Sequence, residues 1–172
     1  MIMELYKTMR TQGGFSLLEV LVCSFILSIL SVSILHGLTA LELESRLAKS
    51  RMNAGLLAAD LREEILSRPP LDPDGSPVMG REAGESGGRL SYDDQDDYQG
   101  YVDGPPTDIG GAPLAGMERL SRAVRIENVA PDRPAGPSTD TGPRGLRRFT
   151  VTVYRDKAEI ARLVWLGVGQ EP

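Results

Sequence analysis

The sequence predicts an α+β fold in which one long N-terminal helix packs on a small antiparallel sheet. An apolar run over residues 15–41 passes into a helical apolar periodicity that ends at about Arg68. After Arg119 the pattern changes to the period-two alternation that is typical of strands. With 172 residues, the chain has room for one modest domain and one appendage.

Charge divides the chain into three regions. Residues 1–68 carry seven basic and seven acidic side chains. Residues 69–118 carry eleven acids and two arginines in a stretch rich in Gly and Pro, which predicts an acidic loop. Residues 119–172 carry ten basic residues and six acids, together with the strand patterns. We therefore expect a helix over 15–68 and a globular head over 69–172.

The first half of the predicted helix is apolar enough to enter a membrane. At ~1.5 Å rise per residue, the run over 15–41 can cross a ~30 Å hydrocarbon core. We expect about residues 15–38 to be transmembrane. The ionisable side chains within this run are Glu19, Cys23 and His36.

A short polar leader, residues 1–14, precedes the apolar run. Its Lys7 and Arg10 predict a cytoplasmic N-terminus. The protein is then a single-pass protein of the inner membrane, with its head on the periplasmic or extracytoplasmic side. An ordinary secretory signal has small residues after its apolar core, whereas here Gly13 and Gly14 come before it. A cut at these glycines would leave the apolar run on the mature chain.

The stretch Gly13-Gly14-Phe15-Ser16-Leu17-Leu18-Glu19-Val20 resembles the prepilin cleavage and methylation motif of type IV pilins and type II secretion pseudopilins. The resemblance implies cleavage after Gly14 by a prepilin peptidase and N-methylation of Phe15, the new N-terminus. It also implies an assembly role for Glu19, which would neutralise the N-terminal amine of a neighbouring subunit. A carboxylate inside a bilayer costs at least ~2 kcal/mol unless it is paired, so Glu19 needs such a partner.

The resemblance also implies a shape, partners and a function. The shape would be the pilin lollipop, a long helix bearing a head. The partners would be other pilin or pseudopilin subunits and the inner-membrane assembly platform. The function would be that of a minor pilin or pseudopilin, a structural subunit without enzymatic activity, in a type IV pilus or a type II secretion pseudopilus. The alternative is a single-pass membrane-anchored ligand-binding protein that does not polymerise.

Beyond the apolar run, the helix is predicted to be amphipathic. Pro69 and Pro70 end it at about Arg68, because proline lacks the N–H that continues a helix. Apolar residues recur there at spacings of three, four and seven, which places them on one face. They are Leu43, Leu47, Ala54, Ala58, Leu61 and Ile65.

Strands are expected at about 119–129, 146–154 and 159–166. The last two are expected to form an antiparallel hairpin through residues 155–158. That turn contains no glycine, so its type stays open. Residues 131–145, rich in Pro, Gly, Ser and Thr, are expected to be an exposed loop.

The run from Tyr92 to Tyr98 holds four aspartates and allows three interpretations. It is a solvated charge run, or a loop stabilised by Ca²⁺, which prefers oxygen ligands, or a surface that docks on the basic C-terminal part of this or a neighbouring subunit. The run also weakly resembles the head loop of accessory pilins of the mannose-sensitive haemagglutinin pilus. The four candidate Ca²⁺ ligands are Asp93, Asp94, Asp96 and Asp97.

Several classes of function find no support in the composition. One cysteine cannot form an intrachain disulfide, and one histidine leaves no zinc cluster or hydrolase triad. The basic residues of the head are scattered among acids, so no nucleic-acid site is expected. We expect no cofactor other than Ca²⁺, under the second interpretation of the aspartate run.

Overall fold

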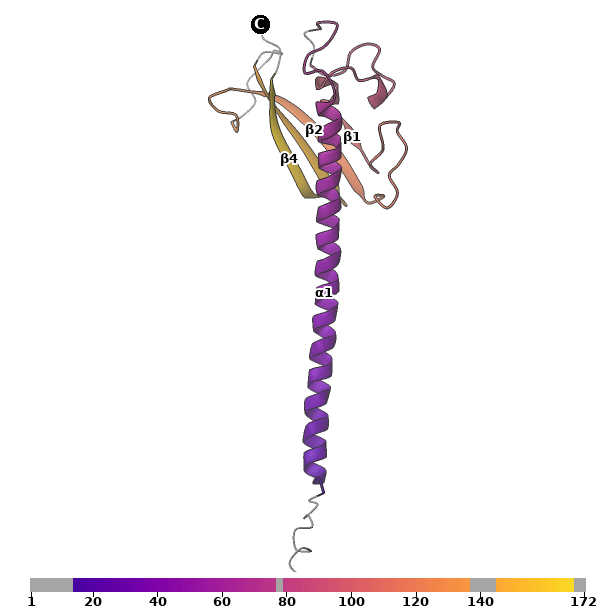
Figure 1. Ribbon diagram of the computed structural model, residues 1–172, viewed down its shortest axis with the longest axis vertical. Helices are drawn as coiled ribbons and strands as arrows, with labels where there is room; N and C mark the ends of the chain where they lie inside the picture. Colours follow the sequence, from indigo (N-terminus) through magenta and orange to yellow (C-terminus); the bar gives the residue numbers. More distant parts are fainter. Residues whose placement is uncertain (1–13, 77–78, 137–144, 169–172) are drawn as a thin grey trace, which may run out of the picture. The chain divides into compact units, whose positions relative to one another are not determined.

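The structure is a computed structural model that describes residues 14–76, 79–136 and 145–168. In these residues it has one α-helix and a four-stranded antiparallel sheet, which confirms the expected α+β class (Figure 1). Residues 1–13 of the predicted leader and residues 137–144 of the predicted loop lie outside the described residues. The described chain divides after Leu47 into two compact units.

The first unit contains the N-terminal part of helix α1, which runs from Leu17 to Leu66. Every described residue up to Leu47 is exposed in the isolated chain. Within the described residues, α1 is the one helix that is long and apolar enough to cross a membrane. No other described residue covers this apolar surface. It is therefore stable in lipid or against apolar surfaces of other molecules.

The second unit contains the sheet and the last turns of α1. Its strands follow the order β1-β2-β3-β4, and each pairs antiparallel with the next. Strands β2, β3 and β4 match the expected strands. Strand β1 was not predicted, because it is only two residues long and lies inside the acidic loop. The strands are β1, Val102–Asp103; β2, Leu120–Val129; β3, Leu146–Arg155; and β4, Ala158–Val168.

The hairpin between β3 and β4 turns on two residues, Asp156 and Lys157. Their φ angles are 50° and 71°, and positive φ at both central residues is what a type I′ turn requires. Arg119 donates from Nε to Asp156 Oδ1 at 3.2 Å, which fixes the turn to the start of β2. The turn type that the sequence left open is therefore settled without a glycine.

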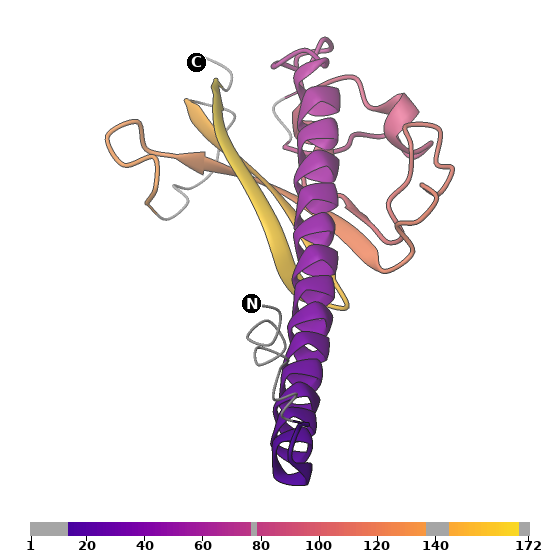
Figure 2. The same cartoon turned by 60° about the horizontal axis from the view of Figure 1, so that its bottom comes forward.

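The last turns of α1 lie against one face of the sheet, as Figures 1 and 2 both show. The core consists of side chains from these two elements and from the acidic loop. The expected helical stripe is partly wrong, because Leu43 and Leu47 are exposed and the described residues provide no cover for them. Leu57, which was not in the expected stripe, is buried. The buried helix residues are Ala54, Leu57, Ala58, Leu61 and Ile65, and Ile126, Phe149, Val151 and Val153 are among the buried strand residues.

Candidate functional site

The junction between the predicted leader and α1 is open to solvent. Ser16 caps the helix, since the Glu19 N–H donates to Ser16 Oγ at 3.1 Å. Phe15 is 80% exposed, and a Cβ atom added to Gly14 would have nothing within 4 Å. The fold itself therefore places no steric demand on Gly14.

The serines of the apolar segment satisfy their own hydrogen bonds. Each hydroxyl donates to the carbonyl oxygen four residues earlier, at 2.7–2.9 Å. Polar groups paired in this way enter hydrocarbon without leaving an unmade hydrogen bond. The four residues are Ser24, Ser28, Ser31 and Ser33.

Glu19 differs from these serines. Its carboxylate has no hydrogen-bond or ion-pair partner within residues 14–76, 79–136 and 145–168. Its place in the first turn of α1 gives it modest stabilisation from the helix dipole. A carboxylate at membrane depth needs more than this, so the arrangement leaves Glu19 available to a cationic group from outside the described chain.

The aspartate run in the head is folded around its own carboxylates. Asp94 Oδ1 accepts the N–H groups of Asp96 and Asp97 at 2.6 and 3.1 Å. Asp97 Oδ2 accepts those of Asp93 and Asp94 at 2.9 and 3.2 Å. Asp94, Asp96 and Asp97 are buried and Asp93 is half-buried, so the interpretation as a solvated charge run is wrong.

Asp96 connects the run to the sheet. Its Oδ2 lies 2.9 Å from Nη2 of Arg147 on β3, and its Oδ1 accepts the Gly80 N–H at 2.7 Å. Both side chains of this ion pair are buried. Asp96 thus docks on the basic C-terminal part of the same chain, which was one of the three interpretations.

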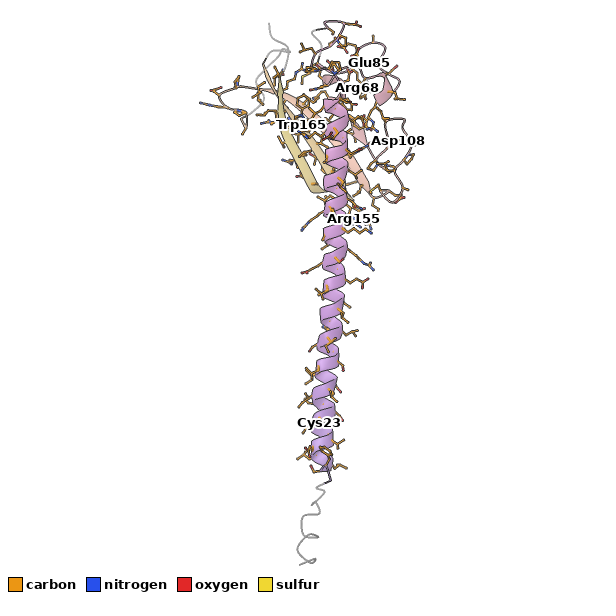
Figure 3. All side chains as sticks on the ribbon, in the orientation of Figure 1. Cys23, Arg68, Glu85, Asp108, Arg155 and Trp165 are labelled. Atoms are coloured by element: carbon orange, nitrogen blue, oxygen red, sulfur yellow. The ribbon has the colours of Figure 1, made fainter. Side chains whose placement is uncertain are left out.

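Two acids that the sequence analysis did not single out, Glu82 and Glu85, join Asp97. One carboxylate oxygen from each of the three lies within 4.8 Å of the others, and we call this set the carboxylate cluster. Glu85 is labelled in Figure 3. A second group of neighbouring carboxylates consists of Asp94, Asp96 and Asp97. Asp93 belongs to neither group. A signal for Glu82 and Glu85 was their spacing of three in a Gly-rich part of the acidic loop.

The carboxyl groups here hold protons unusually strongly. Burial raises the pKa of Asp94 to about 7, and the nearby Asp96 charge adds to the effect. Burial also raises the pKa of Glu85 to about 8, helped by contact with Asp97 and Glu82 and opposed by the Glu82 N–H. The pKa of Asp96 is raised by burial, although the Gly80 N–H and Arg147 act against it.

These pKa values predict that the metal-free head loses stability as the pH rises. The usual pKa values of Asp94 and Glu85 are 3.8 and 4.5, and folding raises them to about 7 and about 8. The folded state therefore binds protons more tightly than the unfolded state. This contribution to the free energy of unfolding is fully present below the usual pKa values and is lost as the pH rises to about 7 to 8. In EDTA, Tm should be several degrees lower at pH 8.5 than at pH 5.5. Fluorescence of Trp165, the only tryptophan, reports it. The difference should shrink in Glu85→Gln; a Tm that rises with pH would contradict the prediction.

The acidic loop is also tied to the end of α1. Glu64 receives a bond from Arg89 Nη1 at 2.7 Å and one from the Tyr98 hydroxyl at 2.8 Å. Gln95 Nε2 donates to the carbonyl oxygen of Arg68 at 3.0 Å. The loop that carries the carboxylate cluster is therefore anchored at both the helix and the sheet.

A family description, the prokaryotic N-terminal methylation motif, matches residues 9–35. This span contains Gly14, Phe15 and Glu19 and does not reach the head. Comparison with curated proteins and with solved structures gave no match. The motif, at the start of a long apolar helix, fits the type IV pilin and pseudopilin family.

Proposed function

We propose that the chain is a minor pilin or pseudopilin, cut after Gly14 by a prepilin peptidase, N-methylated at Phe15 and assembled into a type IV pilus or a type II secretion pseudopilus. Before assembly it is a single-pass protein of the inner membrane, with a cytoplasmic N-terminus and an extracytoplasmic head. It is a structural subunit and not an enzyme. Its partners are other pilin or pseudopilin subunits and the assembly platform.

The unpaired carboxylate of Glu19 carries this proposal. The serines of the same segment are satisfied within the helix, whereas Glu19 is left without a partner in the described chain. Cleavage after Gly14 would create a positive amine at Phe15, one helical turn from Glu19. The Phe15 amine of a neighbouring subunit has the charge that Glu19 needs, and the pairing would tie assembly to processing.

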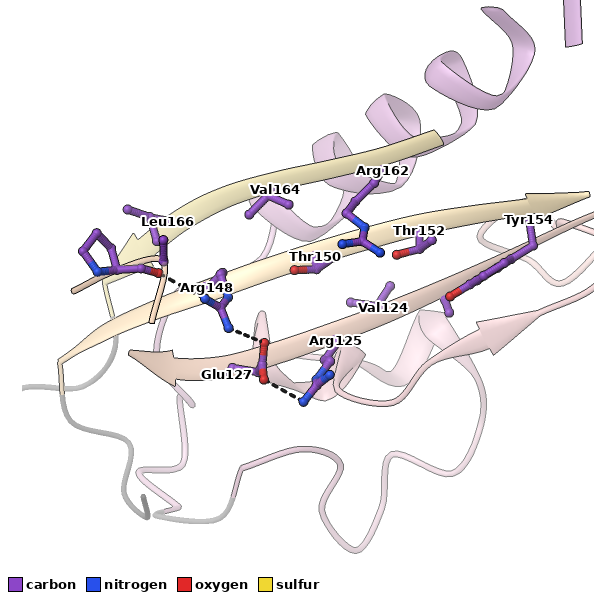
Figure 4. A pocket seen from close by; sticks show the side chains of 13 residues that line it. Val124, Arg125, Glu127, Arg148, Thr150, Thr152, Tyr154, Arg162, Val164 and Leu166 are labelled. Carbon is purple, nitrogen blue, oxygen red and sulfur yellow. Dashed lines mark hydrogen bonds and ion pairs between the residues drawn. The ribbon is translucent and has the colours of Figure 1, made fainter. Parts of the chain in front are cut away.

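A hollow on the sheet favours the alternative, a membrane-anchored protein that binds a ligand. It has a volume of about 740 Å³ and lies on the face opposite the core (Figure 4). Its arginines are partly neutralised: Arg125 and Arg148 both bond Glu127, at 2.7 and 2.8 Å. The half-exposed Val164 and Leu166 add apolar surface. The same surface suits the head of a neighbouring subunit, so the state of the N-terminus distinguishes the two functions.

Replacing Gly14 by Val is expected to leave the leader, residues 1–14, attached to the chain. A side chain before the cut would obstruct an extended backbone in the peptidase site, whereas the fold has open space at this position. Intact mass of the protein extracted from membranes measures the effect. Gly37→Val is the matched control, since a Cβ there also meets nothing within 4 Å. Normal trimming of Gly14→Val would argue against processing at this site.

A further inference from the structure

We propose that the carboxylate cluster, Glu82, Glu85 and Asp97, is a binding site for Ca²⁺ in the head. The cluster brings together two segments of the acidic loop that are twelve or more residues apart in the sequence. An ion held there would cross-link these segments. This inference concerns the head and does not depend on the assembly function of the helix.

Two buried carboxylate oxygens of the cluster have no hydrogen-bond donor among the described residues. Asp97 is fully buried, and its Oδ1 accepts no hydrogen bond within the described residues, while Oδ2 is used by two backbone N–H groups. Glu82 Oε1 is likewise buried and without a donor in the described chain. A buried carboxylate oxygen that has lost water and gained no partner is unfavourable, and a bound cation removes this cost.

The grouping and the chemistry of the oxygens suit Ca²⁺. Ca²⁺ binds oxygens at about 2.4 Å, so two ligands of one ion are at most about 4.8 Å apart. The three carboxylates lie within that distance of one another. Mg²⁺ demands a near-octahedral shell and gives up its water reluctantly, whereas Ca²⁺ accepts the irregular set of oxygens that side chains and solvent supply here. Zn²⁺ prefers His and Cys ligands, and the cluster has neither.

An ion can reach the cluster from solvent. Glu82 and Glu85 line an open hollow of about 210 Å³, and Asp72, Asp74 and Asp93 are among its other lining residues. These acids would attract a cation, and water in the hollow would complete the six to eight oxygen ligands that Ca²⁺ takes.

The second carboxylate group, Asp94, Asp96 and Asp97, is a weaker candidate. Asp96 is already neutralised by Arg147, and Asp94 Oδ1 is occupied by two N–H groups. The proposed ligands therefore differ from the four aspartates that the sequence suggested. Only Asp97 belongs to both sets.

The test uses the full chain in detergent micelles, stripped with EDTA and then given millimolar CaCl₂ or MgCl₂ at pH 7.5. Thermal unfolding is followed by Trp165 fluorescence, because a ligand that binds only the folded state raises Tm. Glu82→Gln and Glu85→Gln each take one carboxylate ligand away from a bound ion and leave the backbone bonds of Asp97 in place. Asp132→Asn, a change at an exposed carboxylate outside the cluster, is the matched control.

CaCl₂ is expected to raise Tm by several degrees in the wild type and in Asp132→Asn, and to do so more than MgCl₂. The shift should fall to less than half in Glu82→Gln and in Glu85→Gln. If Ca²⁺ does not shift Tm in the wild type, the proposal is wrong, and bound protons rather than an ion neutralise the carboxylates of the cluster. An equal shift in all four proteins would also overturn it, since the ion would then act elsewhere.

Discussion

Replacing Glu19 by Val is expected to remove this protein from filaments while leaving its insertion and processing intact. Insertion should become easier, because the change takes a charge out of the apolar segment. In the assembled state, however, the Phe15 amine of the neighbouring subunit would lose its partner. Stranding one member of a buried ion pair costs about 3–5 kcal/mol, which corresponds to a loss of incorporation on the order of hundreds-fold or more.

The fraction of the protein in sheared or co-purified filaments, relative to the total in membranes, measures this loss. Glu19→Gln should have a milder defect, because it keeps the volume and one acceptor oxygen. Ser28→Ala is a matched control in the same segment, since its hydroxyl donates to the Ser24 carbonyl oxygen of its own helix. Equal recovery of wild type and Glu19→Val would show that the carboxylate is not an assembly contact.

Replacing Arg122 by Met should cause the largest loss of stability in the head, about 3–5 kcal/mol of unfolding free energy. Arg122 on β2 is fully buried and bonds Asp103 through Nε at 3.1 Å and Nη2 at 2.5 Å. Nη2 also donates to the Thr107 carbonyl oxygen at 2.7 Å. Met keeps much of the volume but leaves the buried Asp103 charge without its cation.

Urea unfolding of the full chain in micelles, followed by Trp165 fluorescence, measures this effect. Arg125→Met is the control on the same strand, because Arg125 is exposed and, among the described residues, forms an ion pair only with Glu127. Such a surface pair contributes about 0–1 kcal/mol. Similar losses for the two variants would contradict a structural role for the buried pair.

The helix and the three long strands could be predicted from sequence because their signals are local. The end of α1 follows from Pro69 and Pro70, and the alternation in β3 separates buried Val151 and Val153 from Thr150 on the other face. The two-residue strand β1 has no such pattern. Its place depends on its pairing with Ala123 and Arg122 of β2, which are far away in the sequence.

The acidic loop could be recognised from the sequence, but its conformation and contacts could not be predicted. A run of aspartates is usually exposed, and nothing in its pattern indicates that Arg147 on β3 neutralises Asp96. The approach of Glu82 and Glu85 to Asp97 likewise depends on the path of an irregular chain. Periodicity carries no information on contacts of this kind.

The mass of the N-terminal peptide, taken from protein in the filament fraction, tests the central claim most directly. Processing and assembly together predict a chain that begins at Phe15 and carries one methyl group on its amine. Glu19→Val should give the same peptide, but from the membrane fraction. A wild-type chain that begins at Met1 or Ile2 in cells with an active prepilin peptidase, and that is found only in membranes, would contradict the account.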